Sequence, residues 1–377
     1  MTVYILYYTF LLLGYCAIRR SKIDRKCRKS RQQSEKVFLN DLGLLKSVKS
    51  EKPKGRWFVF FVLILLVLIV GLRNQSMGYD LQGYLPAFKI ISKQSWSQVI
   101  ERNYLNYDVG YRIFNKIVGS IVLNENFFLF VCAAFSILPI NILILKESKM
   151  PLLSSLIFLG LPFFLASFSA LRQAIAIGIT VLSYFFIKKR RFFPFLILTV
   201  LASAFHWSAF IFIFAYPLYT LKYNRIVSYG SIVLLLLIWL MKFQVFLFFT
   251  MILGYGGTDN NGAVKLFIFF TLVYIFCVIF GNRKNDETNG LINLFWVVCA
   301  IQAMGGLNII ATRIGYFYMV YLILLLPEVL VDMRSRMKTK DVQLIAFSIG
   351  TFFLFYGLFS LRYSTWAMTF PYRFFWQ

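Results

Sequence analysis

The chain has few acidic residues, few cysteines and a single histidine, and each shortage argues against a class of chemistry. Its 377 residues include 15 Asp and Glu against 40 Lys and Arg, and His206 is the only histidine. The five cysteines form no C-x-x-C pair, which argues against a disulfide framework and a zinc site. The sequence has no P-loop, G-x-G-x-x-G, D-x-D or H-E-x-x-H motif, so we expect no metal and no cofactor.

Apolar residues are abundant and occur in long runs. The chain is 59% hydrophobic and 19% aromatic, with repeated apolar runs of 15 to 24 residues. Such runs are typical of membrane-spanning helices, because a helix satisfies its own backbone hydrogen bonds where water is absent. The sequence therefore predicts an all-α polytopic integral membrane protein in which residues 1–377 form a single transmembrane domain.

The apolar runs predict about 12 transmembrane helices. The first run does not resemble a cleavable signal, because no positive charge precedes it and Arg19-Arg20 follows it. We expect it to remain as a helix. The predicted spans are 2–18, 57–72, 126–145, 151–170, 173–187, 192–205, 207–221, 226–248, 265–281, 291–310, 314–330 and 342–360.

The basic residues predict the orientation of these spans. Fourteen of the 40 Lys and Arg residues lie between Arg19 and Arg56, and alternation of the spans places 28 of the 40 in cytoplasmic loops. This positive-inside pattern makes anionic lipid at the cytoplasmic surface the expected partner, rather than nucleic acid. Residues 19–56 become a basic cytoplasmic loop, and both termini are predicted to be extracytoplasmic.

The long connection 73–125 is predicted to be extracytoplasmic and to contain juxtamembrane helices. Residues 84–100 and 111–123 have helical apolar patterns, but neither stretch reads as a membrane span. We expect both to lie along the membrane surface. A crossing by 111–123 would move every later basic cluster to the opposite side, which the charge pattern opposes.

Four ionisable residues are expected at one height, at the outer ends of the spans. They are Arg73, Arg172, His206 and Arg313. Asp80, seven residues after the first of them, belongs to the same layer. Ionisable groups at apolar helix ends are costly unless they are paired or face a watery cavity. Their common level predicts a site for an anionic ligand.

The three arginines are candidate ligands of a diphosphate. Arginine stays charged, and its planar fork can hold two oxygens at once. The alternative is that Arg73, Arg172 and Arg313 extend to lipid phosphates. Asp80 is the candidate general base, with Tyr84 one helical turn on, unless it is only a solvated loop carboxylate.

Three further residues are weaker candidates. His206 is suited to proton transfer or to hydrogen bonding with a sugar hydroxyl, but a lone histidine can also cap or pack a helix end. Asp108 is a second outer carboxylate of the same loop. Tyr316 is either a sugar-stacking ring or an interfacial anchor, and the anchor interpretation is favoured.

Several short segments occur in a specific order over about residues 70–330. They are Gly71-Leu72-Arg73, Gly78-Tyr79-Asp80 with Tyr84, Asp108-Val109-Gly110-Tyr111, Leu171-Arg172-Gln173-Ala174-Ile175-Ala176, Lys188–Arg191, Leu201-Ala202-Ser203-Ala204-Phe205-His206-Trp207-Ser208-Ala209 and Arg313-Ile314-Gly315-Tyr316-Phe317-Tyr318. The ordered set resembles the EpsG family. Asp108 departs from the family pattern, where Glu would be expected, and loop 19–56 is unusually long.

This resemblance implies a Wzy-type polymerase of a bacterial surface polysaccharide, with a fold similar to the GT-C glycosyltransferases. It implies an inverting transfer from a polyprenyl-diphosphate-linked oligosaccharide to a growing polysaccharide at the outer face of the cytoplasmic membrane. A flippase and a chain-length regulator are candidate protein partners. The candidate sugar-binding residues are Tyr84, Asp108, Tyr111, Gln173 and Tyr316.

Other functions stay open at this point. A glycan ligase would use the same donor, and the sequence barely separates it from a polymerase. A flippase or other transporter would need polar groups at several depths, whereas the 15 carboxylates all lie in or beside predicted loops. A structural scaffold is the last alternative.

Overall fold

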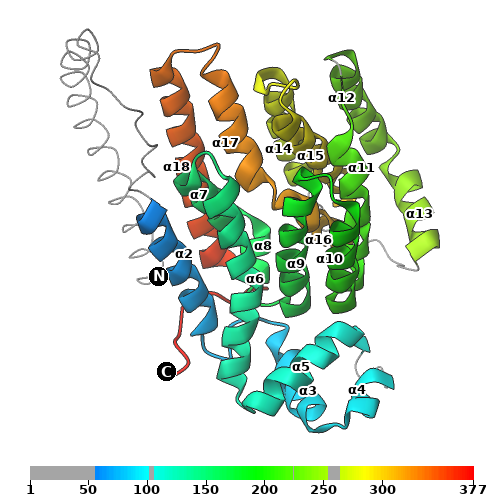
Figure 1. Cartoon of the computed structure of the whole chain (residues 1–377), viewed down its shortest axis with the longest axis vertical. Helices are drawn as coiled ribbons and strands as arrows, with labels where there is room; N and C mark the ends of the chain where they lie inside the picture. The colour runs from blue at the N-terminus through cyan, green and yellow to red at the C-terminus, as the bar shows by residue number, and fades with distance from the viewer. Residues whose placement is uncertain (1–55, 102–105, 224, 254–263) are drawn as a thin grey trace, which may run out of the picture.

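The computed structural model describes four stretches of the chain, 56–101, 106–223, 225–253 and 264–377. The regular elements in these stretches are helices (Figure 1), and the one β-contact described is an isolated bridge between Arg73 and Phe374. The prediction of an all-α protein is thereby confirmed. The predicted first span 2–18 and the basic loop 19–56 lie outside the described residues, apart from Arg56.

The described helices follow the predicted apolar runs closely, and α10 has the predicted bounds. They are α2 (Arg56–Gly71), α3 (Leu81–Lys93), α4 (Trp96–Glu101), α5 (Val109–Ile121), α6 (Glu125–Glu147), α7 (Pro151–Gly160), α8 (Pro162–Ala166), α9 (Leu171–Lys188), α10 (Phe192–Phe205), the 3₁₀ helix η2 (Trp207–Phe214), α11 (Ala215–Thr220), α12 (Arg225–Leu240), α13 (Lys242–Leu253), α14 (Val264–Phe280), α15 (Asp286–Met304), α16 (Ile309–Met319), α17 (Leu322–Met333) and α18 (Thr339–Tyr363).

Helix length bears on the number of membrane spans. In the described part of the chain, α6, α9 and α18 are each long and apolar enough to cross a membrane. Two bent pairs, α12 with α13 at 79° and α16 with α17 at 49°, raise the number to as many as five. The helices are therefore those of a membrane protein, whereas the count of twelve spans and the GT-C-like arrangement stay predictions.

Four predicted spans are not single α-helices. Two of them, 226–248 and 314–330, are the bent pairs just described. The other two are 151–170 and 207–221. Residues 151–170 form α7 and α8, which are separated at Leu161. Pro162 follows this residue, and proline drives the residue before it out of the helical conformation; Leu161 has φ −94° and ψ 145°. Residues 207–221 form η2 and then α11. The apolar runs thus predicted the extent of these segments but not their breaks.

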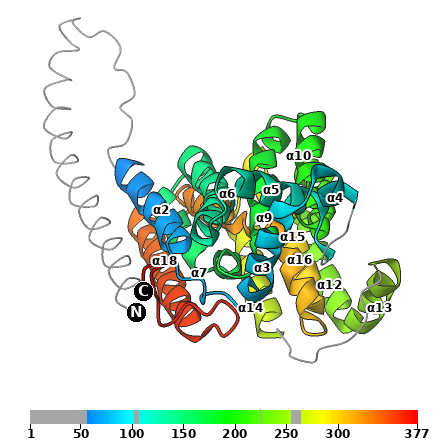
Figure 2. The same cartoon turned by 90° about the horizontal axis from the view of Figure 1, so that it is seen from below.

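Most connections between the described helices lie at two ends of the bundle (Figure 1). At one end, the ammonium group of Lys188 lies 2.6 Å from Glu147 and 2.7 Å from Glu287. At the same end, Lys149 lies 3.7 Å from Glu328. All five belong to loops or helix ends predicted to face the cytoplasm. The other end is crossed by α3, α4 and α5, at the bottom of Figure 1 and facing the viewer in Figure 2.

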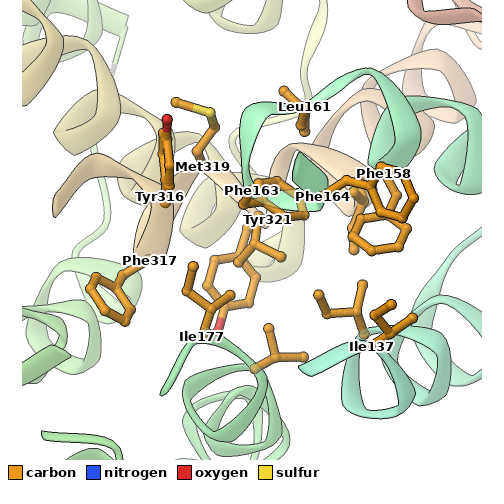
Figure 3. Packing of buried hydrophobic residues seen from close by; sticks show 14 of the residues in the cluster. Ile137, Phe158, Leu161, Phe163, Phe164, Ile177, Tyr316, Phe317, Met319 and Tyr321 are labelled. Carbon is orange, nitrogen blue, oxygen red and sulfur yellow. The ribbon is translucent and has the colours of Figure 1, made fainter. Parts of the chain in front are cut away.

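A cluster of buried aromatic and aliphatic side chains holds the helices together (Figure 3). The ring centroid of Phe158 on α7 lies 5.4 Å from that of Phe163 and 5.3 Å from that of Phe164, both on α8. Ile137 of α6 and Ile177 of α9 belong to the same cluster. Dense packing of this kind fixes where α9 begins, and the candidate site lies at that helix start.

The crossing of α6 and α9 yields a stability prediction. A Cβ at Gly178 would lie 2.5 Å from the carbonyl oxygen of Phe135. Because that oxygen belongs to a helix backbone, Gly178→Leu should destabilise the protein by about 1–3 kcal/mol and lower its Tm. In the control Gly230→Ala, the added Cβ meets open space, so the Tm should remain unchanged or rise. Thermal unfolding in detergent measures both, and an unchanged Tm for Gly178→Leu would contradict the close approach.

Candidate functional site

Five segments meet at the end of the bundle that α3, α4 and α5 cross. Arg172 lies in the first turn of α9, Asp108 is the N-cap of α5, and His206 lies between α10 and η2. Asp80 is the N-cap of α3, and Arg313 lies on α16. Each residue stands at or near a helix end because the apolar runs stop there. The fold therefore gathers charged groups from distant parts of the sequence.

Arg172 is the centre of this cluster. Its Nη1 donates to Oδ2 of Asp108 at 3.1 Å and to the backbone oxygen of Asn106 at 3.4 Å. Its Nε donates to the hydroxyl of Tyr84 at 3.4 Å, and its guanidinium carbon lies 4.7 Å from the ring centroid of Tyr107. The side chains of the ion pair are 20% and 23% exposed. Because water screens such a pair only in part, it is stronger than a surface ion pair.

Asp108 joins a third segment to this ion pair. The backbone N–H of Trp207 donates to its carboxylate. Burial raises the pKa of Asp108, and the charge of Arg172 and the hydrogen bonds oppose that shift. Nδ1 of His206 lies 4.0 Å from Oδ2 of Asp108, too far for a hydrogen bond, and has no hydrogen-bond partner among the described residues. Asp108 therefore links the starts of α5, α9 and η2.

The imidazole of His206 is held in its neutral form. Burial, followed by the positive charges of Arg172 and Arg313, lowers the pKa of His206 to about 4. At neutral pH the ring is therefore uncharged. It can hydrogen-bond to a sugar hydroxyl, but it is a weak proton acceptor.

Arg313 lies beside Arg172, but its guanidinium makes fewer contacts with other residues. Nε2 of Gln173 donates to the backbone oxygen of Arg313 at 2.7 Å, which ties α16 to the start of α9. The guanidinium carbon of Arg313 lies 5.0 Å from the ring centroid of Trp366. Within the described part of the chain this guanidinium makes no hydrogen bond or ion pair. Its donors are therefore available to an anion.

Asp80 offers a carboxylate that no described residue binds. Its backbone N–H donates to the hydroxyl of Ser169 at 3.1 Å, which fixes the turn before α3. The half-buried side chain does not cap α3, and it forms neither a hydrogen bond nor an ion pair with any described residue. Tyr84 lies one turn on. Burial raises the pKa of Tyr84, Arg172 opposes this shift, and the charge of Asp80 adds to it. The carboxylate is thus close to the cluster and is not paired with any described residue.

The structure sets Arg73 apart from the other two predicted diphosphate ligands. Its side chain is fully buried, and its guanidinium donates to the backbone oxygens of Val70, Met77 and Phe168. Gly78 supports the same turn, because its φ is 120° and a Cβ there would overlap the carbonyl of Phe168. These contacts give Arg73 a structural role, in which it holds the loop before α3 against the segment before α9.

Two of the predicted sugar-binding tyrosines are buried. Tyr111 is 0% exposed, and its ring packs against Tyr84 and Tyr107 with centroid separations of 5.6 and 5.5 Å. Tyr316 is 7% exposed on α16. Neither presents an open ring face on which a sugar could stack. Tyr111 instead supports Tyr84 and Tyr107, which contact Arg172.

The C-terminal segment, residues 364–377, completes the site, and the sequence analysis missed it. The backbone N–H of Tyr79, one residue before the candidate base, donates to the carbonyl of Trp366 at 3.1 Å. The N–H of Asn74 donates to the carbonyl of Arg373 at 2.9 Å. The segment is therefore paired with the loop between α2 and α3. Apart from many aromatic residues after the last apolar run, the sequence holds no signal for this long-range pairing.

The chemistry of the site follows from its five ionisable groups. They comprise two guanidinium groups, two carboxylates and a neutral imidazole. In the part of the chain that the structure describes, no three His, Cys, Asp or Glu residues are placed to hold a metal ion. The arrangement is suited to binding an anion by charge and to accepting a proton nearby.

The family model described as the EpsG family matches residues 56–374 of this chain. The matched region contains all the described helices and most of the C-terminal segment. No curated protein matches the chain, and no solved structure matches it.

The low pKa of His206 can be measured directly, because it is the only histidine. An NMR titration of protein with isotope-labelled histidine should give a midpoint near 4. Arg313→Gln removes one of the two named positive charges and should raise that midpoint. Because the folded-state pKa lies below the unfolded value, His206 should also lower stability as the pH falls from about 6.5 to about 4. A midpoint near 6.5 in the wild type would contradict the buried placement.

The Arg172–Asp108 ion pair predicts an energetic coupling. Each single alanine variant leaves one partly buried charge without its partner, whereas the double variant removes both. The loss of stability in the double variant should therefore be smaller, by about 0.5–3 kcal/mol, than the sum of the losses in the two single variants. The exposed pair Lys222–Asp286, at 3.3 Å with side chains 75% and 63% exposed, is the control and should couple by less than about 1 kcal/mol. The free energies of unfolding are measured with denaturant. If the losses in the two single variants add up to the loss in the double variant, the ion pair is excluded.

Proposed function

Because the chain belongs to the EpsG family, a family of Wzy-like polysaccharide polymerases, we propose that it polymerises a bacterial surface polysaccharide. The product is an O-antigen, a capsule or an exopolysaccharide. The donor is an oligosaccharide repeat unit linked to a polyprenyl diphosphate, and the acceptor is another repeat unit. The reaction takes place at the outer face of the cytoplasmic membrane.

One observation carries this proposal. The charged groups of Arg172 and Arg313 lie near the carboxylate of Asp80, which has no partner among the described residues, at one end of an apolar bundle. At the opposite end, Lys188 is already held by two carboxylates. A polyprenyl diphosphate keeps its chain in the bilayer and its headgroup at the membrane surface. The arginine end supplies the charge that such a headgroup requires.

The arginines act in the step in which the leaving group departs. In the proposed reaction, the acceptor hydroxyl attacks the anomeric carbon, and the bond from this carbon to the diphosphate oxygen breaks with inversion. The two electrons of that bond leave with the diphosphate. The guanidinium N–H groups of Arg313 stabilise the negative charge that develops on the diphosphate. Arg172, which Asp108 already holds in position, assists it.

The proton of the attacking hydroxyl passes to Asp80 in this mechanism. Asp80 suits this role better than Asp108, whose carboxylate already accepts from Arg172 and from the N–H of Trp207. His206 instead hydrogen-bonds to a sugar hydroxyl, because its ring is buried near Arg172 and Arg313, whose positive charges oppose its protonation. We therefore assign the base to Asp80, the better candidate from the sequence, and a sugar-binding role to His206.

The donor itself supplies the driving force, since its sugar is joined to a good leaving group and ATP is absent outside the cell. The proposal implies that the donor arrives at the outer face before polymerisation. A flippase that delivers it and a regulator that limits chain length are therefore the expected protein partners.

Substitutions at the arginines and at Asp80 test the function. In a deletion strain, Arg172→Ala and Asp80→Asn should each lower polymer yield by about 100-fold or more, while the protein still inserts. Arg313→Lys keeps the charge but loses the planar fork, so it should retain partial activity. The control is Arg334→Ala, an exposed arginine at the opposite end, which should behave as wild type. Gel analysis of the polysaccharide and immunoblotting of membranes provide the measurement.

Polymer of normal length and yield in Arg172→Ala would contradict the assignment. The products of the deletion strain separate the alternatives. Single repeat units indicate a polymerase, long unattached polymer indicates a ligase, and inward-facing lipid-linked units indicate a flippase.

A further inference from the structure

A groove lies between α12 and α15, away from the candidate site. Its cavity measures about 300 Å³, and the residues that define it here are Val227, Gly230, Ser231, Leu234, Asn293 and Trp296. We call it the α12–α15 groove. Val227 and Leu234 are seven residues apart on α12, so the groove extends for about 10 Å along that helix. It begins near the end of the bundle that carries the Lys188 ion pairs.

The polar groups in the walls of this groove are already satisfied. The indole N–H of Trp296 donates to the backbone oxygen of Ser231 at 3.1 Å, and the hydroxyl of Ser231 lies 2.8 Å from that of Tyr274. The amide of Asn293 donates to the backbone oxygens of Leu218 and Leu221, both at 2.9 Å. The groove therefore offers mainly methyl, methylene and ring surface. An apolar chain is its chemically matched occupant.

The mouth of the groove is basic. Nη1 of Arg283 donates to Oδ1 of Asn293 at 2.6 Å, and its guanidinium carbon lies 6.0 Å from the ring of Tyr223, which also lines the cavity. Nε and Nη2 of Arg283 are buried and make no hydrogen bond of normal geometry with a described residue, but the hydroxyl of Tyr274 lies close enough to interact with the guanidinium. Lys284 is exposed beside it. The positive charges of Arg283 and Lys284 attract an anion to this end of the groove.

The position of the groove indicates where its occupant comes from. Val233, Leu236 and Leu240 on α12 are 58%, 53% and 62% exposed, which is typical of a helix face in contact with lipid. The basic end of the bundle is the one that the charge pattern assigns to the cytoplasm. In that leaflet lipid acyl chains surround the helices, and the anionic lipid headgroups are attracted to basic residues.

We propose that the α12–α15 groove binds an anionic phospholipid of the cytoplasmic leaflet, with one acyl chain in the groove and the phosphate beside Arg283. The lipid fills space that the helices leave open, and its phosphate offsets the positive charge of Arg283 and Lys284. The site is independent of the proposed polymerase reaction, because it lies at the opposite end of the bundle. Its occupancy should stabilise the contact between α12 and α15.

Gly230 allows the groove to be closed without disturbing the fold. A Cβ at this position meets open space, so Gly230→Leu should fill the groove while α12 still packs. Val233→Leu adds bulk to the outer face of the same helix and is the matched control. Arg283→Gln removes the charge at the mouth, and its control is Lys340→Gln, an exposed basic residue in the first turn of α18 at the same end.

The test is the thermal unfolding of the purified full-length protein in neutral detergent, titrated with phosphatidylglycerol or with phosphatidylcholine of the same acyl chains. The wild type should gain more Tm from phosphatidylglycerol. For Arg283→Gln, the phosphatidylglycerol concentration that gives half of the maximal rise in Tm should be about fivefold higher than for the wild type. The reason is that one basic contact contributes about 1 kcal/mol. Gly230→Leu should lose the response to both lipids, while Val233→Leu and Lys340→Gln respond as wild type.

Two results would overturn the proposal. Equal responses of the wild type to both lipids would exclude recognition of the anionic headgroup. A wild-type response in Gly230→Leu would exclude the groove as the binding site. If Arg283→Gln does not fold, a count of bound phosphatidylglycerol by native mass spectrometry, for wild type against Gly230→Leu, decides the question by itself: equal counts reject the site and a lower count supports it.

Discussion

The candidate site depends on the ion pair between Arg172 and Asp108. Both charges lie where apolar helices end, and each would be costly there without the other. Their contact at 3.1 Å joins the start of α9, which is fixed by the aromatic core, to the start of α5, which lies across the end of the bundle. Tyr84 and Tyr107 pack against the same guanidinium. The pair therefore sets the position of the surface helices relative to the bundle.

The two polar ends of the bundle differ in how their charges are used. At one end, Lys188 is shared between carboxylates of α6 and α15, and this arrangement holds the helices together. At the other end, Asp80 and Arg313 have no ionic partner among the described residues. Charged groups that lack a protein partner beside a fixed ion pair are better candidates for ligand binding than paired ones, because they remain able to bind a ligand. This contrast supports placing the reaction at the Arg172 end.

Some of this organisation could be predicted from the sequence, and physical reasons explain the rest. Apolar periodicity located helices such as α10, α3 and α5, because the side chains that a helix buries recur along the sequence at the helical period. Charge placement grouped Arg172 with Arg313. The buried role of Arg73 was not predictable, since the carbonyls that it binds are not visible in a sequence. The contribution of Trp366 depends on pairing between residues almost 300 positions apart, for which local patterns carry no signal.

The central claim is that the Arg172 end faces outward and the Lys188 end faces the cytoplasm. Labelling of engineered single cysteines in intact cells with a membrane-impermeant thiol reagent tests it most directly. Gln82 is exposed on α3 beside Asp80, and Lys189 is exposed at the opposite end. The account predicts that Gln82→Cys is labelled from outside and that Lys189→Cys is labelled only after the cells are permeabilised. The reverse pattern, or labelling of both from one side, would contradict it.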